Sequence, residues 1–255
     1  MFAPFKRRVA LLPALLAALL TSVPAVAADL TVSAAASLTN AFKDLAPLFE
    51  SANRGHKLQF NFAASGALLQ QIAKGAPVDV FASADQETMD QAQAQKLIDA
   101  AQRHNFAANA LVVIVPAASS KVPDALPDLA QAGFQRIAIG RPASVPVGRY
   151  TKGALEAARV WNQVQRSMVS AQSVRQVLDY VARGEVDAGF VYATDARLMP
   201  DKVKVALTVP TATPILYPAA PVIASAQPAL ARAFVEFLLT PPAQAVLAKH
   251  GFASP

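Results

Sequence analysis

The sequence predicts an α/β fold, and three observations lead to this class. Strand-like and helix-like segments alternate from residue 29 almost to the C-terminus, as in α/β proteins. The first strands are joined to the helices that follow them by short connections, as in a parallel sheet. The run Asn109–Val115 is almost continuously apolar, which suits a strand buried on both faces or a crossing between two lobes.

The composition is that of a folded protein with an ample core. Of the 255 residues, 54% are apolar and 16% are charged, a balance that excludes an intrinsically disordered protein. The length allows one large domain or two of ordinary size. Since the chain has no cysteine, neither a disulfide framework nor a thiolate metal site can form.

Residues 1–27 are typical of a cleaved secretory signal peptide. The basic residues Lys6-Arg7-Arg8 precede the uncharged run Val9–Leu20, and the small residues Ala25-Val26-Ala27 follow. The apolar run is too short to span a bilayer. We therefore expect cleavage after Ala27 and an exported, soluble protein.

The net charge of +6 does not indicate a nucleic-acid partner. Residues 1–27 contain three basic and no acidic residues, so the remaining chain has 20 basic and 17 acidic residues. This small excess, without a run of Lys or Arg, gives no electrostatic footprint for nucleic acid.

The strands are expected at regular intervals after the leader. They are predicted over 30–36, 57–63, 78–84, 109–115, 136–140, 187–192 and 203–209. A Pro-rich stretch, 210–221, separates the last of these strands from two C-terminal helices.

The helices are predicted from apolar residues at helical spacing and from their end signals. In the first helix, Leu38, Phe42, Leu45 and Phe49 share one face, and Pro47 should interrupt and kink it. Further helices are predicted over 67–74, from Asp85 towards Leu97, over 148–160, from Ser173 to Gly184, and over 229–239 and 243–250.

Three places combine a strand end, a small polar segment and a helix start. They are Ala34-Ala35-Ala36-Ser37, Ala63-Ala64-Ser65-Gly66 and Ser173-Val174. Helix N-termini present unpaired N–H groups and a partial positive charge, so they bind anions without a cationic side chain. A serine at such a place either caps its own helix or donates to a bound oxyanion. Ligands of open α/β sheets bind at the carboxyl ends of strands, so both readings stay open for Ser37 and Ser65.

Other candidate residues carry weaker signals. The histidines His56, His104 and His250 have no second ligand at metal spacing. Neither Ser37 nor Ser65 lies in a Gly-x-Ser-x-Gly elbow, which argues against a hydrolase nucleophile.

Two side chains at strand ends need partners. Asp85 follows a strand, where capping the next helix is its expected use. Tyr192 ends a strand that is expected to be buried, so its hydroxyl needs a backbone carbonyl or a ligand.

Six stretches in this order resemble the periplasmic molybdate-binding proteins of ABC-type molybdate importers, over essentially the whole chain after the leader. They are Ala34-Ala35-Ala36-Ser37-Leu38-Thr39, Ala64-Ser65-Gly66-Ala67-Leu68, the segment from Gly75 to Asp85, Val145-Pro146-Val147-Gly148-Arg149-Tyr150, Ser173-Val174-Arg175 and the segment from Gly189 to Asp195. The first and third stretches recur among solute-binding proteins generally, whereas the ordered set is more specific.

The resemblance implies a periplasmic-binding-protein type II fold, in which a hinge joins two α/β lobes around a ligand cleft. Lobe 1 would comprise 29–109 and 217–255, and lobe 2 would comprise 110–216. The implied protein is a periplasmic monomer that captures molybdate, and also tungstate, and passes it to a membrane permease. It is not an enzyme, and it has no cofactor.

The resemblance also implies the ligand contacts. They are the hydroxyl and backbone N–H groups of Ser37 and Ser65, the backbone N–H groups of Val147 and Val174, and the hydroxyl of Tyr192. Molybdenum would be held only as its oxyanion, without direct protein ligands to the metal. The family commonly has Ala at position 147, where this chain has Val.

Neutral donors can replace the hydration of a dianion, so no buried counter-ion is required. Arg141, Arg149 and Arg175 lie beside the matched stretches, and we expect Arg149 and Arg175 to meet solvent or carboxylates between the lobes. Three alternatives remain: a binding protein for sulfate, phosphate or another small anion, a periplasmic serine hydrolase, and an anion-responsive signalling module. The hydrolase lacks a His or Lys base near either serine in the sequence.

Overall fold

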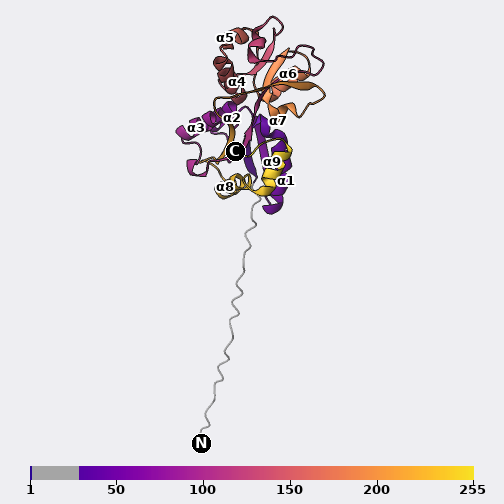
Figure 1. The fold of residues 1–255 in the computed structure, drawn as a ribbon. Coiled ribbons are helices and arrows are strands. Elements are labelled where there is room, and N and C mark those ends of the chain that lie inside the picture. The colour runs from indigo at the N-terminus through magenta and orange to yellow at the C-terminus, as the bar shows by residue number, and fades with distance from the viewer. Residues whose placement is uncertain (2–28) are drawn as a thin grey trace.

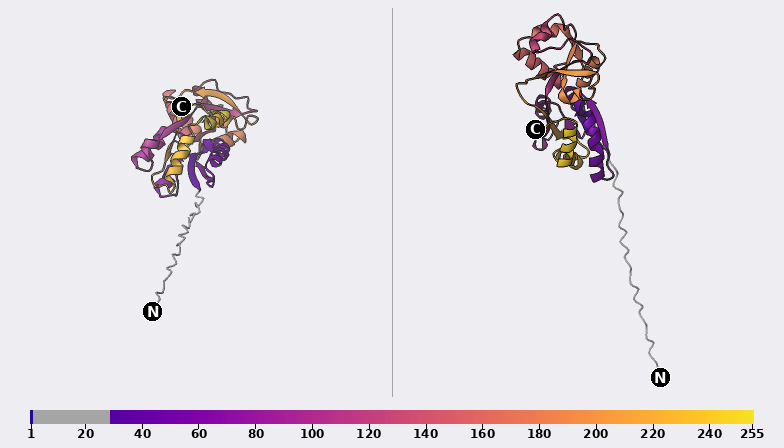
Figure 2. Two further views of the ribbon diagram at one scale, coloured as in Figure 1. Left: turned by 90° about the horizontal axis from the view of Figure 1, so that it is seen from below. Right: turned by 45° about the vertical axis from the view of Figure 1, so that its right-hand side comes forward.

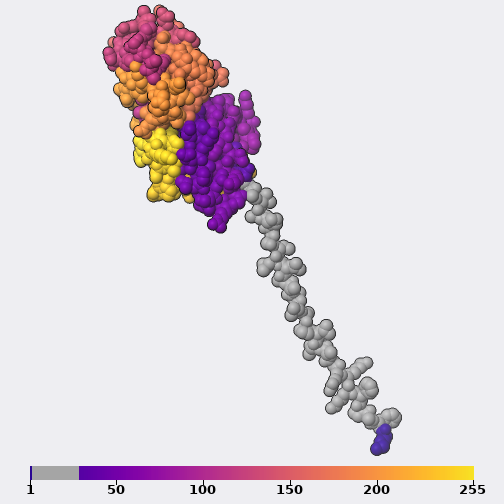
Figure 3. Space-filling view, turned by 90° about the vertical axis from the view of Figure 1, so that its right-hand side faces the viewer, coloured from indigo at the N-terminus to yellow at the C-terminus, as the bar shows by residue number. Residues whose placement is uncertain are grey.

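The chain folds into two α/β lobes placed end to end (Figure 1). This computed structural model describes Met1 and residues 29–255, so the predicted signal peptide lies outside the described residues apart from Met1. The space-filling view shows an elongated body in which the C-terminal helices lie beside the first strands and helices, in the same lobe (Figure 3).

Lobe 1 is built on a five-stranded sheet with the order β2-β1-β3-β10-β4. Its strands are β1 (Leu30–Ala35), β2 (Leu58–Ala63), β3 (Val80–Ala82), β4 (His104–Asn109) and β10 (Ile215–Pro221). β1 pairs in parallel with β2 and β3, which confirms the parallel arrangement predicted for the first strands. β10 runs antiparallel to both β3 and β4.

Lobe 2 contains a second five-stranded sheet, with the order β7-β6-β8-β5-β9. Its strands are β5 (Leu111–Pro116), β6 (Ile137–Gly140), β7 (Met168–Ala171), β8 (Ala188–Tyr192) and β9 (Val203–Val209). β6 is parallel to β7 and β8, whereas β5 is antiparallel to β8 and β9. Each lobe therefore combines three parallel strands with two others, one of which is antiparallel to its neighbours on both sides.

The helices cover the two sheets. Lobe 1 carries α1 (Thr39–Ala52), α2 (Ser65–Ala73), α3 (Gln86–Ala94), α8 (Pro228–Phe237) and α9 (Pro241–Lys249). Lobe 2 carries α4 (Pro146–Ala157), α5 (Trp161–Val164), α6 (Val174–Ala182) and α7 (Ala193–Ala196). Short 3-10 turns are η1 (Ala36–Leu38), η2 (Ala100–Gln102), η3 (Leu126–Ala130) and η4 (Gln165–Ser167).

Aromatic packing joins the two ends of the chain in lobe 1. The ring of Phe234 on α8 meets the rings of Phe42 and Phe49 on α1, at centroid distances of 5.8 and 5.1 Å. All three side chains are buried, and such edge-on pairs add to the stabilisation from burial. This packing holds the C-terminal helices against the first part of the chain, as both views in Figure 2 show.

The chain crosses between the lobes twice. β4 ends at Asn109 and β5 begins at Leu111, so one residue, Ala110, separates the two sheets. The return crossing runs from the end of β9 at Val209 to the start of β10 at Ile215. Short crossings of this kind can act as a hinge. The boundaries 29–109 with 217–255, and 110–216, remain a proposal.

The prediction that Pro47 interrupts the first helix is wrong, because α1 continues from Thr39 to Ala52 through it. Pro47 removes the hydrogen bond to the carbonyl of Lys43, one turn earlier. Both residues are exposed, so water can take the place of the missing donor.

Strands β4, β7 and β10 were not predicted. β10 is the most instructive, because it contains Pro218 and still lies between two other strands. The pairing register with β4 shifts between Tyr217 and Pro218, and such an irregularity tolerates a residue without an N–H group. The Pro218 carbonyl still accepts a hydrogen bond from the Ser83 N–H, at 2.9 Å.

Between residues 29 and 255, no helix is both long enough and apolar enough to cross a membrane.

Candidate functional site

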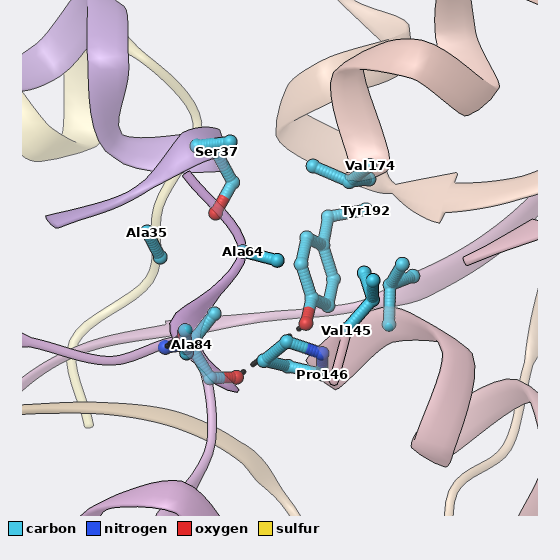
Figure 4. A pocket seen from close by; sticks show the side chains of 11 residues that line it. Ala35, Ser37, Ala64, Ala84, Val145, Pro146, Val174 and Tyr192 are labelled. Atoms are coloured by element: carbon cyan, nitrogen blue, oxygen red, sulfur yellow. Dashed lines mark hydrogen bonds between the residues drawn. The ribbon is translucent and has the colours of Figure 1, made fainter. Parts of the chain in front are cut away.

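The junctions singled out in the sequence meet around one cavity between the lobes (Figure 4). Lobe 1 contributes Ala35, Ala36, Ser37, Ala64, Ser65 and Ala84, and lobe 2 contributes Val145, Pro146, Val147, Val174 and Tyr192. All five residues expected from the sequence to contact a ligand therefore lie together: Ser37, Ser65, Val147, Val174 and Tyr192.

The cavity is small and its lining is uncharged. Its volume is about 10 Å³, close to the minimum of roughly 10–15 Å³ that holds a single water molecule. Sites for drug-sized ligands measure about 300–1,000 Å³. None of the described residues that line the cavity has a charged side chain. The space therefore excludes drug-sized ligands, and a ligand larger than a water molecule needs the lobes to stand slightly further apart than they do here.

Three helices begin at the cavity wall. α2 begins at Ser65, α4 begins at Pro146, one residue before Val147, and α6 begins at Val174. The first four N–H groups of a helix have no acceptor within that helix, and they carry the positive end of its dipole. The amides of Ser65, Val147 and Val174 all belong to this group. The wall thus offers positive potential without a cation.

Neither of the two serines that line the cavity, Ser37 and Ser65, caps a helix. No side-chain cap is formed at the start of η1, α1 or α2, whereas Ser173 caps α6 by accepting from the Gln176 N–H. The Ser65 hydroxyl oxygen instead accepts from the Ala84 N–H at 3.0 Å, and it is fully buried. Because that oxygen already accepts a bond, the Ser65 proton is available for another acceptor.

Tyr192 reaches the same cavity from the end of β8. Its side chain is 1% exposed, and its hydroxyl lies 3.4 Å from the Ala84 carbonyl, to which it donates. Burial raises the pKa of Tyr192 well above its ordinary value of 10, and the neighbouring Tyr217 raises it further. The hydroxyl keeps its proton and serves as a donor throughout the neutral range.

Arg149 joins the lobes beside the cavity without lining it. From α4 of lobe 2, its Nε donates to the Asp85 carboxylate of lobe 1 at 2.8 Å, and an Nη donates to the Thr88 hydroxyl. Asp85 also caps α3, as predicted, by accepting from the Thr88 N–H. The expectation that Arg149 meets a carboxylate across the lobes is confirmed.

Arg175 joins the lobes on α6. Its guanidinium donates to the Ser37 carbonyl at 3.1 Å and to the Asn40 side chain at 2.8 Å, both in lobe 1. Its Nε also lies 2.7 Å from Oδ1 of Asp195, a close ion pair in which neither atom completes a well-aligned hydrogen bond. The carboxylate that pairs with Arg175 therefore belongs to its own lobe, not to the opposite one.

Asp195 is an unusual partner because its side chain is fully buried. Burial raises the pKa of Asp195 to about 6, although the positive charge of Arg175 opposes the shift. The cost of burial thus exceeds the benefit of the ion pair, as is common for buried charges.

The lobes also touch through the backbone at Gly66. Its N–H donates to the Ser144 carbonyl of lobe 2 at 3.0 Å. A Cβ atom at position 66 would lie 2.7 Å from that oxygen and 2.9 Å from the Ser144 Cα. Only glycine permits this close approach, one residue from Ser65.

Val147 is fully buried at the start of α4. A Cβ atom placed on Gly140 would lie 3.1 Å from Cγ1 of Val147, so the missing side chain of Gly140 leaves room for the valine.

Sequence reasoning missed two residues behind the cavity, Asn109 and Tyr217. The Tyr217 hydroxyl lies 3.1 Å from the Ser37 hydroxyl oxygen and accepts from Asn109 at 3.3 Å. Tyr217 stands in the Pro-rich stretch, and no local pattern there points to Ser37, which is 180 positions away.

The histidines form no metal site in the described part of the chain. There, no three His, Asp or Glu side chains come close enough to hold a metal ion. His250 instead contacts the Asp44 carboxylate at 2.9 Å.

The family model for bacterial extracellular solute-binding proteins matches residues 30–253. The molybdate-binding protein ModA of Escherichia coli (strain K12) is 38% identical over 231 residues, which cover 88% of each chain. The structure of the periplasmic molybdate-binding protein of Azotobacter vinelandii is similar, with a TM-score of 0.77 and 27% identity, and covers 89% of this chain and 99% of its own.

The sulfate-binding protein SubI of Mycobacterium tuberculosis H37Rv has a TM-score of 0.78 at 20% identity, over 89% of this chain and 87% of its own, a likeness of fold alone. Together with the two lobes and the cavity between them, these matches agree with the type II architecture expected from the sequence. The chain belongs to the bacterial extracellular solute-binding proteins.

Proposed function

We propose that this protein captures molybdate, and also tungstate, in the periplasm and delivers it to the membrane permease of an ABC transporter. The observation that carries the proposal is the small, uncharged cavity at three helix N-termini. The similarity to molybdate-binding proteins supports the choice of anion.

In the proposed complex, the hydroxyl and N–H groups of Ser37 and Ser65 donate from lobe 1. The N–H groups of Val147 and Val174 donate from lobe 2, and the Tyr192 hydroxyl does so once its single proton turns from the Ala84 carbonyl to the anion. All oxygens of a tetrahedral oxyanion are acceptors, so they match a wall made of donors. Since each lobe supplies part of the set, the anion favours the closed arrangement of the lobes.

The proposed selectivity follows from cavity size and donor number. Molybdate and tungstate share charge and shape, and both are larger than sulfate. The site is therefore expected to reject sulfate more strongly than it separates molybdate from tungstate. Molybdenum is bound only within its oxyanion, with no protein ligand to the metal and no additional cofactor.

We propose that the protein is a monomeric carrier and not a hydrolase. The described lining of the cavity contains no His, Lys or carboxylate that could take a proton from Ser37 or Ser65. Residues 1–27, with Lys6-Arg7-Arg8 before an apolar run, support export.

Calorimetric titration of ligand-free protein with molybdate, tungstate, sulfate and phosphate tests the proposal. Molybdate and tungstate should bind tightly, and sulfate and phosphate weakly or not at all. A ligand bound only by the folded protein stabilises it by about 4 kcal/mol at 1,000 times its Kd. Molybdate should therefore raise the melting temperature by several degrees, and a larger rise with sulfate would favour a sulfate carrier instead.

A further inference from the structure

Behind Ser37 lies a chain of hydrogen bonds that begins at the crossing between the lobes. Asn109 is the last residue of β4, and its Oδ1 accepts from the Ala110 N–H at 2.9 Å. This bond fixes the orientation of the amide, because an N–H group must face the oxygen. The Asn109 amide nitrogen therefore points the other way.

The amide nitrogen of Asn109 has two protons and two acceptors. It donates to the Thr194 hydroxyl of lobe 2 at 2.9 Å and to the Tyr217 hydroxyl oxygen at 3.3 Å. The direction of the second bond is unambiguous, because an amide NH₂ group can only donate.

The hydrogen bond from Asn109 also sets the direction of the next hydrogen bond, between Tyr217 and Ser37. It is fully buried, and burial raises its pKa well above the ordinary value of 10, so it keeps its single proton. Its oxygen already accepts from Asn109, and its other hydrogen-bond partner among the described residues is the Ser37 hydroxyl oxygen at 3.1 Å. The tyrosine proton is thus directed to Ser37, which acts as the acceptor.

Ser37 therefore does not donate its own proton to Tyr217. Ser65 stands in the same situation, because its oxygen accepts from the Ala84 N–H. A different donor therefore approaches each of the two serines from outside the cavity, and each serine has a free proton. Both hydroxyls are prepared as donors before an anion arrives.

We propose that Asn109 and Tyr217 are positioning residues that hold the Ser37 hydroxyl as a hydrogen-bond donor towards the bound oxyanion. Neither residue lines the cavity, so both act through Ser37. The inference rests on the proposed function, since it assumes that an oxyanion occupies the cavity.

A double-mutant cycle with Tyr217→Phe and Ser37→Ala tests the inference by calorimetry with molybdate. Tyr217→Phe should weaken binding about tenfold, in line with the loss of one hydrogen bond to a charged ligand. In the Ser37→Ala background the same change should have little further effect, because the hydroxyl that it orients is gone. Tyr180→Phe on α6 removes a tyrosine hydroxyl elsewhere and should bind like the wild type.

Asn109→Asp tests the direction of the hydrogen bonds that run from Asn109 through Tyr217 to Ser37. The carboxylate has almost the same shape, and it still accepts from the Ala110 N–H, but it takes the Tyr217 proton instead of donating to it. Tyr217 then no longer donates to Ser37, and binding should weaken at least tenfold. The loss of affinity that comes from the added negative charge should shrink as the salt concentration rises. The loss that comes from reversing the hydrogen bond between residue 109 and Tyr217 should persist at high salt.

Two results would overturn the inference. One is a Tyr217→Phe variant that binds like the wild type, and the other is a Tyr217→Phe loss that adds in full to the Ser37→Ala loss. If the wild type binds sulfate but not molybdate, the proposed function fails, and the same cycle run with sulfate decides the role of Tyr217. A wild type that binds neither anion would overturn both.

Discussion

The lobes meet both at the cavity wall and at the contacts of Arg149 and Arg175 beside it, but these two regions use different chemistry. The cavity wall has only hydroxyls, amides and apolar groups, whereas Arg149 and Arg175 lie outside it and contact Asp85, Asp195 or backbone carbonyls. A buried cation attracts any dianion, while oriented neutral donors favour an anion whose oxygens fit their positions. The difference fits the proposed function, in which dipoles recognise the ligand and charged groups act on the closure of the lobes.

The flanking ion pairs are not strong stabilisers in themselves. Arg149 and Asp85 have side-chain exposures of 15% and 4%, so both groups lose much of their hydration when they pair. Such buried pairs often offset little more than their desolvation cost, but they require a defined geometry. The Arg149–Asp85 pair joins the two lobes, so its main effect is to define how they meet.

Among the charged residues outside the cavity wall, we expect Asp195 to have the strongest effect on the protein. A folded-state pKa of about 6, above the ordinary 3.8, means that the folded protein favours the protonated acid. The associated stability is fully present below pH 3.8 and is lost as the pH rises through 6. Two pKa units correspond to at most about 3 kcal/mol.

Asp195→Asn should remove this loss. Its free energy of unfolding, relative to the wild type, should therefore increase between pH 4 and pH 7 in denaturant titrations without ligand. A difference between the two proteins that stays constant over this range would contradict the raised pKa of Asp195.

The next prediction concerns the uncharged cavity wall, and in particular its two serines. Losing one hydrogen bond to a charged ligand costs about 1.5–3 kcal/mol, so Ser37→Ala or Ser65→Ala should weaken molybdate binding roughly tenfold to a hundredfold. Calorimetry measures the change, with the exposed Ser51→Ala on α1 as the matched control. Unchanged affinity in both site variants would show that the anion does not depend on these donors.

Gly66→Ala should change the closure of the lobes without altering any charge. The three nearest atoms to the added Cβ all belong to Ser144 of the opposite lobe, so the variant should fold normally and close poorly. Overpacking costs about 1–3 kcal/mol, here paid by the closed form alone, which predicts binding weaker by about tenfold or more. The control is Gly153→Ala on α4, where an added Cβ meets no atom within 4 Å. If Gly66→Ala also lowers the melting temperature of the ligand-free protein, the added Cβ destabilises the fold itself, and the contact is not specific to closure.

The smallest effect is expected for Arg149→Gln. Arg149 does not touch the cavity, so its loss should weaken molybdate and tungstate equally, by less than either serine variant and with a clear dependence on salt. Titrations at two salt concentrations check this, with the exposed Arg183→Gln as control. An Arg149 variant that abolishes binding while both serine variants bind normally would reverse the assignment of roles.

Local sequence singled out part of the cavity lining. Ser37 and Ser65 became candidates because a strand end, a small polar segment and a helix start follow one another in the chain, although a capping role stayed open for both. Val147 and Tyr192 were reached only through the family resemblance, since a backbone amide leaves no trace in sequence and a tyrosine at a strand end has several uses.

Other features depend on contacts between distant segments. The bonds from Tyr217 to Ser37 and from Asn109 to Tyr217 span 180 and 108 positions, and no local spacing encodes them. β4 is an edge strand with a mixture of buried and exposed residues, and β10 contains prolines, so neither had a clear strand pattern. Arg149 was correctly expected to meet a carboxylate across the lobes, but which carboxylate it meets follows only from how the lobes close.

The position of β10 has a consequence for how the chain folds. β10 inserts between β3 and β4, yet the whole second sheet is synthesised before it. Lobe 2 has all its strands within residues 111–209 and can form while β3 and β4 still have unpaired edges, which are prone to wrong pairing. Pairing between distant segments is slow, so insertion of β10 is expected to be a late step in folding. The same step brings Tyr217 to Ser37, and the nascent protein gains its complete set of prepared donors only when the last strand is in place.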